Sequence, residues 1–560
     1  MQVNTHESQT AKEIKGIVQD LCDISGYGIN SGTRCGPKLD AFVDYIHNKL
    51  HAAGQTDAVL EPIKVNNPFP EKYRVSVEIG GNTTDLTEKC FPLHWTAGTP
   101  PQGITGNLVY LGDGSKSSFE QTDVAGKIAL IDEKMARGYI ATAKEASIEA
   151  KNRGAIAILR ANLQVDSPQQ QKGEGTPDNL FPIPVFCFGK SGGDYLRELI
   201  LSEIKHLVKI ELDVPHNVYD TYNISLELKG NGSSNEVILI GTHYDTGHFT
   251  GTVDNNASIA LMIKWAEYFS NIPVQSRNRD LIFAWCCAHD FDMNSGHYQF
   301  AAAHKEQLKK AIVWDVDHAI GGTRYIYDEA KGEIVPVPGE TCVFYIISNN
   351  YTFSRLASFV MDKYGFCCNH NRFGSSARGP QWGMAPDTSP WVSVASIPIY
   401  YHSIFDTPDK ITIDHIQRAY SANIEIIENI SKLPDGFLFY DNISRTRPNT
   451  PPKVKIAVLS DTVKAGDMVW AWNDETAFYD DRSYYHYPAL PEWAGTIWEW
   501  GDGAVSVGGT ERAEGPLQSQ ADYATHVYQQ PGNYTVTMKC TDVDGATTIA
   551  SKTIRVLPFP

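Results

Sequence analysis

The chain has 560 residues, with 48 Lys and Arg against 66 Asp and Glu, and a net charge of −18 at pH 7. This excess of acid argues against a protein that binds nucleic-acid duplexes, whose binding surface would be basic. The composition, 42% hydrophobic and 20% charged, is typical of a globular protein rather than a disordered one. The length predicts about three or four domains at roughly 150 residues each. No apolar run reaches the ~18 residues of a membrane span.

Two helices are predicted near the N-terminus, within residues 11–53. Apolar residues at helical spacing form one face of each, first Ile14, Ile17, Val18 and Leu21, then Leu39, Phe42, Val43, Ile46 and Leu50. Residues 1–8 contain no basic stretch followed by an apolar one, so we expect no signal peptide within the sequence as given. We assign residues 1–89 to the N-terminal part of a catalytic domain.

Residues 90–215 have a different sequence pattern, in which short apolar runs alternate with glycine-rich turns. Strands are predicted at 107–111, 127–131 and 155–159, and a helix at 141–153. We therefore expect a β-rich domain inserted into the catalytic one.

Residues 216–440 follow a repeated pattern of strand, loop and helix. Apolar runs of strand length lie at 237–241, 281–288, 312–315, 342–347 and 397–401, and a helix is expected soon after Asp254. This alternation predicts an α/β domain with a mostly parallel mixed sheet sandwiched by helices. Ligands of such sheets bind beyond the carboxyl ends of the strands.

The last part of the chain is rich in strands and poor in helices. Residues 441–453 contain several prolines and polar residues and are predicted to form a semi-rigid linker. Residues 454–560 alternate apolar and polar side chains between Gly and Asp turns, which predicts a C-terminal β-sandwich.

Histidine and aspartate follow the predicted strands of residues 216–440 at equivalent positions. These residues are His243, Asp245, Asp254, His289, Asp290, Asp315, Asp317, His318 and His402. Imidazole and carboxylate together suit Zn²⁺, and a mixed set of about five such groups suits two metals that share a carboxylate. Any one of them alone is more often a turn cap or a solvated group, but their recurrence at strand ends favours a metal site.

Three stretches of the chain resemble known families. The runs 241–245 (GTHYD), 254–258 (DNNAS) and 401–410 (YHSIFDTPDK) resemble the M28 family of zinc aminopeptidases. Residues 124–130 (VAGKIAL) and 153–155 (RGA) resemble the protease-associated (PA) domain that many members contain as an insert. In the tail, 498–503 (WEWGDG) and 531–536 (PGNYTV) resemble a PKD domain.

The resemblance to M28 implies a role for each candidate residue. Two zinc ions would be held by His243, Asp254, Asp290, Asp317 and His402, with Asp254 bridging both ions. Asp315 is an alternative for the role of Asp317. Asp245 would hold the imidazole of His243 without contacting a metal. Tyr401 is a candidate oxyanion donor, although simple packing is an equally good explanation for it.

The main departure from the family pattern lies at His289. The family has Glu-Glu after this strand, the first acting as general base and the second as a zinc ligand, whereas this chain has His289-Asp290. Asp290 keeps a carboxylate, and an imidazole with an ordinary pKa near 6.5 can serve as a base. Alternatively, His289 binds a metal and leaves no base. A shift of the alignment by one residue would give that result, with Ala288 at the base position.

We therefore expect a secreted zinc exopeptidase that removes N-terminal residues from peptides, with His289 and Tyr401 as catalytic residues and one or two Zn²⁺ per chain. The extracellular location is inferred from the accessory domains, and the PKD-like domain suggests an extracellular polymer or surface as a partner. One alternative is a catalytically impaired binding protein on the same scaffold. Another is a single-zinc enzyme similar to glutaminyl cyclases.

Overall fold

The fold is described from a computed structural model. It describes residues 5–29, 31–70, 72–133, 143–168, 180–247, 249–292, 295–318, 320–342, 344–348, 350–366, 368–373, 389–396, 398–439, 454–458, 460–473, 495–508, 523–541 and 547–558. The predicted linker at 441–453 lies outside these residues.

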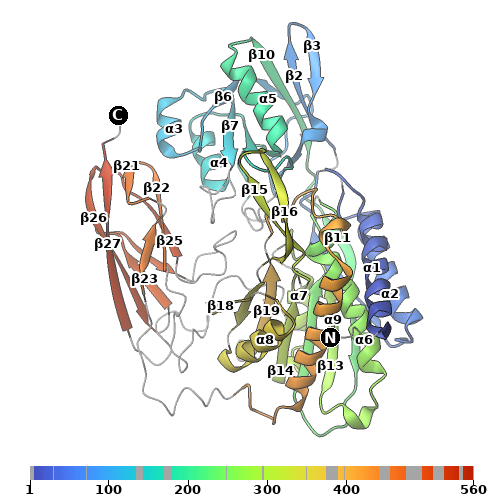
Figure 1. Ribbon diagram of the computed structural model, residues 1–560. Helices are drawn as coiled ribbons and strands as arrows, with labels where there is room; N and C mark the ends of the chain where they lie inside the picture. Colours follow the sequence, from blue (N-terminus) through green and yellow to red (C-terminus); the bar gives the residue numbers. More distant parts are fainter. Residues whose placement is uncertain are drawn as a thin grey trace.

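An eight-stranded mixed sheet forms the centre of the catalytic part (Figure 1). Its strands in spatial order are β1 (Val59–Asn66), β11 (Val218–Leu228), β13 (Asp280–Cys286), β12 (Val237–His243), β14 (Ala311–Val316), β19 (Trp391–Ser396), β17 (Phe344–Ser348) and β18 (Cys368–Phe373). The pairs of β12 with β13, β12 with β14 and β14 with β19 are parallel, whereas β11 and β17 run antiparallel to their neighbours β13 and β19. The predicted α/β class with a mostly parallel, mixed sheet is confirmed.

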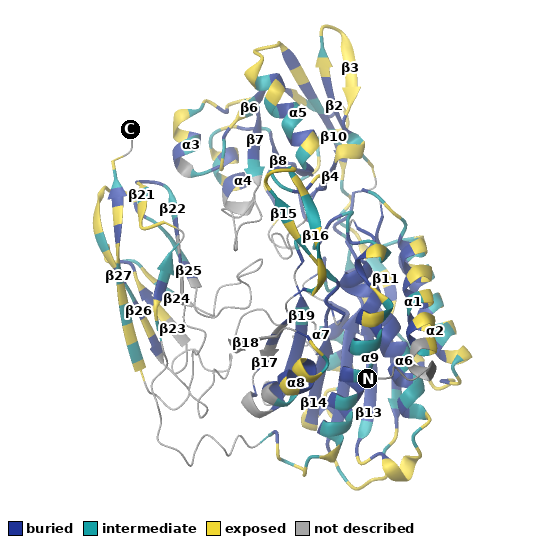
Figure 2. Cartoon of the chain, in the orientation of Figure 1, coloured by how far each residue is buried: buried dark blue, intermediate teal, exposed yellow. Residues whose placement is uncertain are grey.

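Helices cover both faces of this sheet, as its apolar strands require. One face packs against α1 (Thr5–Ser25), α2 (Pro37–Ala52), α6 (Ala257–Ser270), α8 (Tyr351–Lys363) and α9 (Ile413–Lys432), and the other against α7 (Gly296–Ala303) and the short helix Gln307–Lys310. Strand β12 is accordingly buried on both sides: Ile238 and Ile240 join the larger core, whereas Leu239 joins the smaller one. Figure 2 shows the central strands as a buried layer between these helices.

A second unit is inserted between β1 and β11. These two strands pair antiparallel with Asn66 opposite Val218, so the chain leaves and returns to the central sheet at neighbouring points. One sheet of the insert contains β3 (Asn82–Asp85), β2 (Lys72–Ile79), β10 (His206–Asp213) and β5 (Ile104–Gly106). The other contains β4 (Cys90–Pro92), β9 (Val185–Phe188), β8 (Ala157–Asn162), β7 (Ile128–Glu133) and β6 (Leu108–Tyr110), and the helices are α3 (Lys116–Gln121), α4 (Ala143–Asn152) and α5 (Lys190–Leu201).

The sheet pairing moves the boundary between the N-terminal catalytic segment and the insert, which was expected at residue 89. Strand β2 lies within the expected N-terminal catalytic segment, yet it pairs along its whole length with β10 of the insert. By topology, then, the insert begins just after Asn66 rather than at residue 90. Apolar alternation in β2 does not reveal this, because either sheet would bury the same side chains.

The C-terminal unit consists of two packed sheets. One contains β20 (Ile456–Val458), β22 (Met468–Asn473) and β25 (Tyr523–Val527), and the other β21 (Thr462–Lys464), β27 (Thr547–Leu557), β26 (Gly532–Thr541), β23 (Gly495–Glu499) and β24 (Val505–Gly508). Trp498, Trp500 and Tyr528 are fully buried in the core between them. The predicted β-sandwich is confirmed. Ser117 of α3 donates a 2.7 Å hydrogen bond to Asp467, which links this unit to the insert.

Most predicted elements of residues 216–440 lie where the sequence placed them, but the strand expected at 397–401 is wrong. The strand β19 ends at Ser396, and the described residues after it form turns, with the N–H of Tyr401 donating to the carbonyl of Pro398 at 2.9 Å. Pro398 cannot donate a ladder hydrogen bond, so it cannot continue an inner strand. The hairpin of β15 (Thr323–Asp328) and β16 (Glu333–Thr341) was not expected. Of the described helices, none combines the length and apolarity that crossing a membrane requires.

Candidate metal centre

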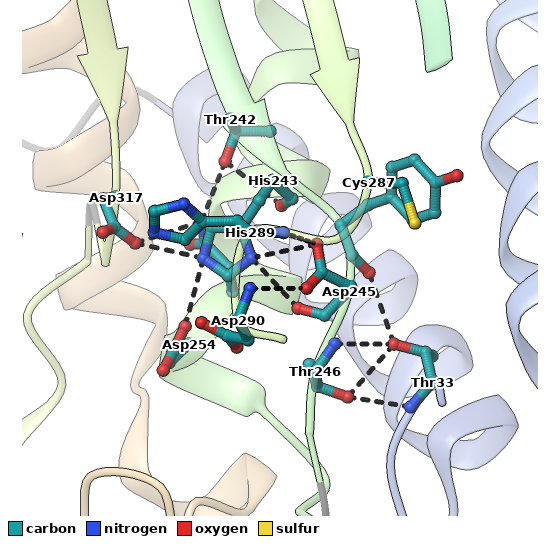
Figure 3. Close-up of polar contacts among 12 residues, drawn as sticks. Thr33, Thr242, His243, Asp245, Thr246, Asp254, Cys287, His289, Asp290 and Asp317 are labelled. Atoms are coloured by element: carbon teal, nitrogen blue, oxygen red, sulfur yellow. Dashed lines mark hydrogen bonds and ion pairs between the residues drawn. The ribbon is translucent and has the colours of Figure 1, made fainter. Parts of the chain in front are cut away.

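The parallel strands bring the candidate residues to one edge of the central sheet (Figure 3). His243 ends β12 and lies opposite Cys286, the last residue of β13, in the strand register. The loop after β13 carries His289 and Asp290, and Asp317 follows the last residue of β14. Because parallel strands end at the same edge, residues separated by up to 74 positions meet there.

Asp254 reaches this edge from the short helical segment Thr252–Asn256 that precedes α6. The carboxylate of Asp406 accepts the backbone N–H groups of Val253 at 2.9 Å and of Asp254 at 3.1 Å. Asp406 thus fixes the backbone that presents Asp254. Burial raises the pKa of Asp406 to about 7, although these two hydrogen bonds act in the opposite direction.

A first group of four donor atoms surrounds one oxygen of Asp254. Nε2 of His243 lies 3.3 Å from both Asp254 Oδ1 and Asp317 Oδ1. Nε2 of His318 lies 3.1 Å from the same two oxygens. All four residues are buried, and their donor atoms are close enough to hold a single ion.

A second group forms around the other oxygen of the same carboxylate. Nε2 of His402 lies 3.0 Å from Asp254 Oδ2 and 3.9 Å from Asp290 Oδ1. These three buried side chains could hold a second ion. Asp254 therefore belongs to both groups and contributes a different oxygen to each.

The electrostatics of the edge favour an ionised Asp254. Burial alone would raise the pKa of Asp254, but the imidazoles of His318, His243 and His402 outweigh it and hold the pKa well below its usual range. The pKa of His243 is conversely raised well above its usual value, because Asp290, Asp254 and Asp317 outweigh its burial. Neither carboxylate oxygen of Asp254 accepts a hydrogen bond of ordinary geometry within the described part of the chain. An ionised, buried carboxylate without such bonds is the environment that a bound cation satisfies.

Asp245 acts on the site in a different way from the one expected. Its carboxylate accepts the backbone N–H groups of His289 and Asp290, each at 2.9 Å. The atom that approaches Nδ1 of His243 most closely is the main-chain carbonyl oxygen of Asp245, at 3.0 Å, whereas Oδ1 is 3.8 Å away. Asp245 thus orients the His243 ring through its backbone and fixes the loop of Asp290 through its side chain.

His289 lies beside the first group. Its ring centroid is 4.6 Å from that of His243 and 5.5 Å from that of His297, and its side chain is half-buried. It also forms a group with His243 and Asp290 whose donor atoms lie within 4.8 Å of one another. This position is compatible with either of the roles expected for His289, a base or a ligand.

Tyr401 packs on one of the candidate ligands. Its ring stacks on that of His402, with centroids 3.7 Å apart and an interplanar angle of 20°. It also lies 5.3 Å from the ring of His318. The ring therefore helps to fix the plane of the His402 imidazole.

Asp315 lies away from the candidate metal groups. Its Oδ2 accepts a 2.5 Å hydrogen bond from the hydroxyl of Ser393 in the adjacent strand β19, and it joins none of the groups found among the described residues. Asp317, two residues later, contributes to the first group. This geometry favours Asp317 over the alternative Asp315.

Sequence reasoning gave no role to two residues of this edge, His318 and Asp406. Both lie within motifs already singled out: His318 directly follows Asp317, and Asp406 lies four residues after His402. Adjacency to a candidate ligand was the available signal for His318. No such signal indicates that the Asp406 carboxylate bonds to the backbone of residue 254.

Family models match three parts of the chain. Residues 223–427 match Peptidase family M28, residues 104–196 match the PA domain, and residues 492–557 match the PKD domain. The chain thus matches these three family models at the positions that the sequence motifs indicated.

Individual proteins resemble the same region. The chain is 29% identical over 274 residues to the probable lipoprotein aminopeptidase LpqL of Mycobacterium tuberculosis, an alignment covering 47% of this chain and 50% of that relative. Among solved structures, a peptidase M28 precursor from Shewanella amazonensis matches with a TM-score of 0.58 and 19% identity, covering 80% of this chain and 98% of its own. The zinc aminopeptidase BSAP of Bacillus subtilis matches with a TM-score of 0.53 and 17% identity, covering 76% and 96%. The aligned part spans about half the length of the curated relative, and the two structures show a shared fold.

Proposed function

We propose that this M28 chain is a secreted zinc aminopeptidase, which removes N-terminal residues from peptides at a site for two ions. One ion would be held by His243, Asp254 and Asp317, and the other by Asp254, Asp290 and His402. The observation that carries this proposal is the presence of two buried groups of donor atoms that share Asp254, one on each oxygen of its carboxylate.

The donor set fits zinc. Imidazole nitrogen and carboxylate oxygen are ordinary zinc ligands, and the ionised state of Asp254 supplies the negative charge that a pair of cations needs. Zinc bound there would supply Lewis acidity and would lower the pKa of water towards neutral pH. The residues around them orient the ligands and handle the protons.

His289 is proposed as the general base. Its half-buried imidazole lies next to His243 of the first group, and its backbone N–H is held by Asp245. The ring is therefore placed so that one of its nitrogens would accept a proton from water at this edge. Tyr401 is proposed to donate a hydrogen bond from its hydroxyl to the developing oxyanion. Its stacking on His402 places the ring beside the second group of donor atoms.

The PA insert is proposed to shape access to the site. Two hydrogen bonds support this role: Trp95 Nε1 donates to the carbonyl of Phe291 at 2.8 Å, and Ser167 Oγ accepts from the N–H of Ile404 at 3.0 Å. Phe291 directly follows Asp290, and Ile404 lies two residues after His402. The insert therefore contacts both loops that carry ligands of the second ion.

The domain boundaries, the role of the PKD domain and the substrate class are proposals that rest on the families that the three parts of the chain match. The sequence divides the chain into 1–89 and 216–440 for the catalytic domain, 90–215 for the PA domain, 441–453 for a linker and 454–560 for the PKD domain. We move one boundary because of the sheet pairing: residues 67–89 belong to the insert, so the N-terminal part of the catalytic domain is 1–66. The PKD domain would act as a spacer or bind an extracellular polymer or surface. Peptides are the proposed substrates.

The function is tested by incubating the full chain with peptides of defined sequence. Three forms of each peptide are compared: unblocked, N-acetylated and C-amidated. The protein is used zinc-loaded, chelator-treated, and as the Asp254→Asn variant, and products are followed by mass spectrometry. Aminopeptidase action predicts stepwise loss of N-terminal residues from the unblocked and C-amidated peptides with zinc-loaded protein. No release by folded, zinc-loaded protein would refute the proposal, and release from the N-acetylated peptide alone would reassign the cleaved end.

A further inference from the structure

The first group contains one more protein ligand than the second. Its four donor atoms are His243 Nε2, Asp254 Oδ1, Asp317 Oδ1 and His318 Nε2, and each nitrogen lies 3.1–3.3 Å from each oxygen. In a tetrahedral zinc site with bonds of about 2.0–2.1 Å, neighbouring donor atoms are about 3.3 Å apart. A tetrahedron of four donor atoms has six such distances, and the four nitrogen–oxygen distances here are close to the required length.

His318 is held in an orientation typical of a metal ligand. Its Nδ1 makes a short hydrogen bond to the main-chain carbonyl oxygen of Ser396, which requires a proton on Nδ1. Its other ring nitrogen, Nε2, is the one directed at the carboxylates. Metal-binding histidines usually donate their second ring N–H in this way, which fixes the tautomer and the ring plane.

The backbone at His318 is also unusual. Its φ of 50° lies in the left-handed region, which costs energy for a residue other than glycine. Its N–H donates a 3.2 Å hydrogen bond to Oδ1 of Asn255, and the side chain is almost completely buried. This turn of the backbone allows His318 to face the same point as its neighbour Asp317, although adjacent side chains of an extended strand would face opposite ways.

The second group lacks such a residue. Asp254, Asp290 and His402 offer three donor atoms, and no fourth His, Cys, Asp or Glu joins them among the described residues. Zinc sites with four protein ligands are closed, whereas those with three leave a position for water or substrate.

We infer that His318 is the fourth protein ligand of the first metal, so that the first site is closed and substrate enters the coordination sphere of the second. This inference rests on the proposed pair of metal sites and refines it. The two ions would then differ in role: the first would occupy a closed site of four protein ligands, and the second would be the one open to water and substrate.

The test counts the imidazoles bound to the first ion. The full chain with His402→Ala, which disables the second site, is loaded with one equivalent of Co²⁺ and compared with the same chain carrying His318→Asn. Asparagine tolerates the left-handed backbone but is too short to reach the ion. X-ray absorption should find two imidazoles per cobalt before this change and one after it, with Co²⁺ binding at least about tenfold weaker. As a matched control, His304→Asn removes a histidine that pairs with Glu61 away from the site and should change neither quantity.

The outcomes separate this inference from the proposed function. An unchanged imidazole number and affinity in His318→Asn would overturn the inference, because His318 would then be an imidazolium paired with the two aspartates. Loss of cobalt in Asp254→Asn, with two imidazoles in the parent, would support the closed site even if no peptide were cleaved. Failure of every form to bind cobalt would overturn the metal sites themselves.

Discussion

The backbone N–H of Asp290 donates a 2.9 Å hydrogen bond to Oδ2 of Asp245, a residue that lies 45 positions earlier in the chain. The other oxygen of the same carboxylate accepts the N–H of His289. Both acceptors lie on one buried side chain at the end of β12. The position of the loop after β13 is therefore set from the neighbouring strand.

This relationship predicts that Asp245→Asn weakens the second metal site. Asparagine offers one acceptor oxygen in place of two, so one of the two N–H groups is left without its partner and the loop shifts. We expect zinc affinity at that site, or the rate of peptide hydrolysis, to fall about 10–100-fold. Zinc titration with the full chain checks this. Asp220→Asn, on an exposed carboxylate, is the control, and an equal effect of the two changes would contradict the proposed role of Asp245.

A second prediction concerns metal stoichiometry. Asp254→Asn should reduce the zinc content from two ions per chain towards none, because Asp254 supplies an oxygen to both groups. Asp290→Asn should remove one ion, because Asp290 belongs to the second group and not to the four-residue first group. Elemental analysis after dialysis measures both. Equal loss of zinc in the two variants would show that Asp254 is not shared between two ions as proposed.

The role of His289 is decided by measuring metal content and rate together. If His289 is the base, His289→Ala should lower kcat about 10²–10⁴-fold and leave the zinc content unchanged. If His289 is a ligand, the zinc content falls as well. His289→Glu restores a carboxylate base and should recover part of the rate lost in His289→Ala only in the first case. A variant with normal zinc and a normal rate would exclude both roles.

The buried ion pair of Arg279 and Glu236 predicts a large effect on stability. Nη2 of Arg279 lies 2.8 Å from Glu236 Oε2, and the guanidinium also donates to main-chain carbonyls at the end of α9, including those of Ser431 and Leu433. Both side chains are almost fully buried. Glu236→Gln leaves the buried guanidinium with one remaining carboxylate, the half-exposed Asp435 at 3.3 Å from Nη2, so the free energy of unfolding should fall by about 3 kcal/mol, the lower end of the range for a broken buried pair.

The control for this pair is its exposed counterpart, Lys64 and Asp220. Breaking that pair with Asp220→Asn should change the free energy of unfolding by no more than about 0.5 kcal/mol. Urea unfolding of the full chain gives both values. Similar effects of the two substitutions would argue against a structural role for the buried pair.

A pH prediction follows from His415 near the start of α9. Burial, together with the positive charge of Arg418, lowers the pKa of His415 to about 4 from an ordinary value of 6.5. The unfolded chain therefore binds a proton that the folded chain excludes, so stability is lost as the pH falls from 6.5 towards 4. We expect this residue to account for about 1 kcal/mol of the loss between pH 7 and 5, after allowance for partial solvation.

His415→Leu removes the titrating group and should make the loss smaller by that amount. Wild type and variant are compared at the same zinc concentration, so that contributions shared by the two proteins cancel. The free energy of unfolding at pH 7 and pH 5 is the measurement. Equal losses in the two proteins would refute the contribution of His415.

The sequence identifies the candidate ligands that lie at strand ends, but it does not identify the contacts that depend on local backbone geometry. His243 and Asp317 follow apolar runs long enough to be recognised as strands, so their meeting at one edge could be predicted. The candidate ligand His402 is expected at the end of a strand over 397–401, but β19 ends at Ser396 and Pro398 prevents its continuation. The proximity of His402 was nevertheless correct, since the turns after β19 remain at the same edge.

His318 shows where sequence reasoning stops. In an extended chain Asp317 and His318 would point to opposite faces, so their adjacency argues against a shared target. The left-handed φ of His318 turns its side chain to the same side as that of Asp317, and no pattern in the sequence predicts this backbone conformation. The two hydrogen bonds that Asp245 makes to the loop after β13 are equally invisible, because they depend on where the backbone of residues 289 and 290 comes to lie.

The pairing of Asn66 with Val218 has a consequence for how such a chain can change its architecture. The two ends of the 67–217 segment leave adjacent strands about 4.8 Å apart, as the ends of any hairpin loop do. The entropic cost of closing a loop rises only slowly with the length of the loop. A whole domain can therefore connect two strands that a two-residue turn could also connect. The junction is therefore a point at which the inserted segment can be exchanged or shortened while the register of β1 with β11 is kept.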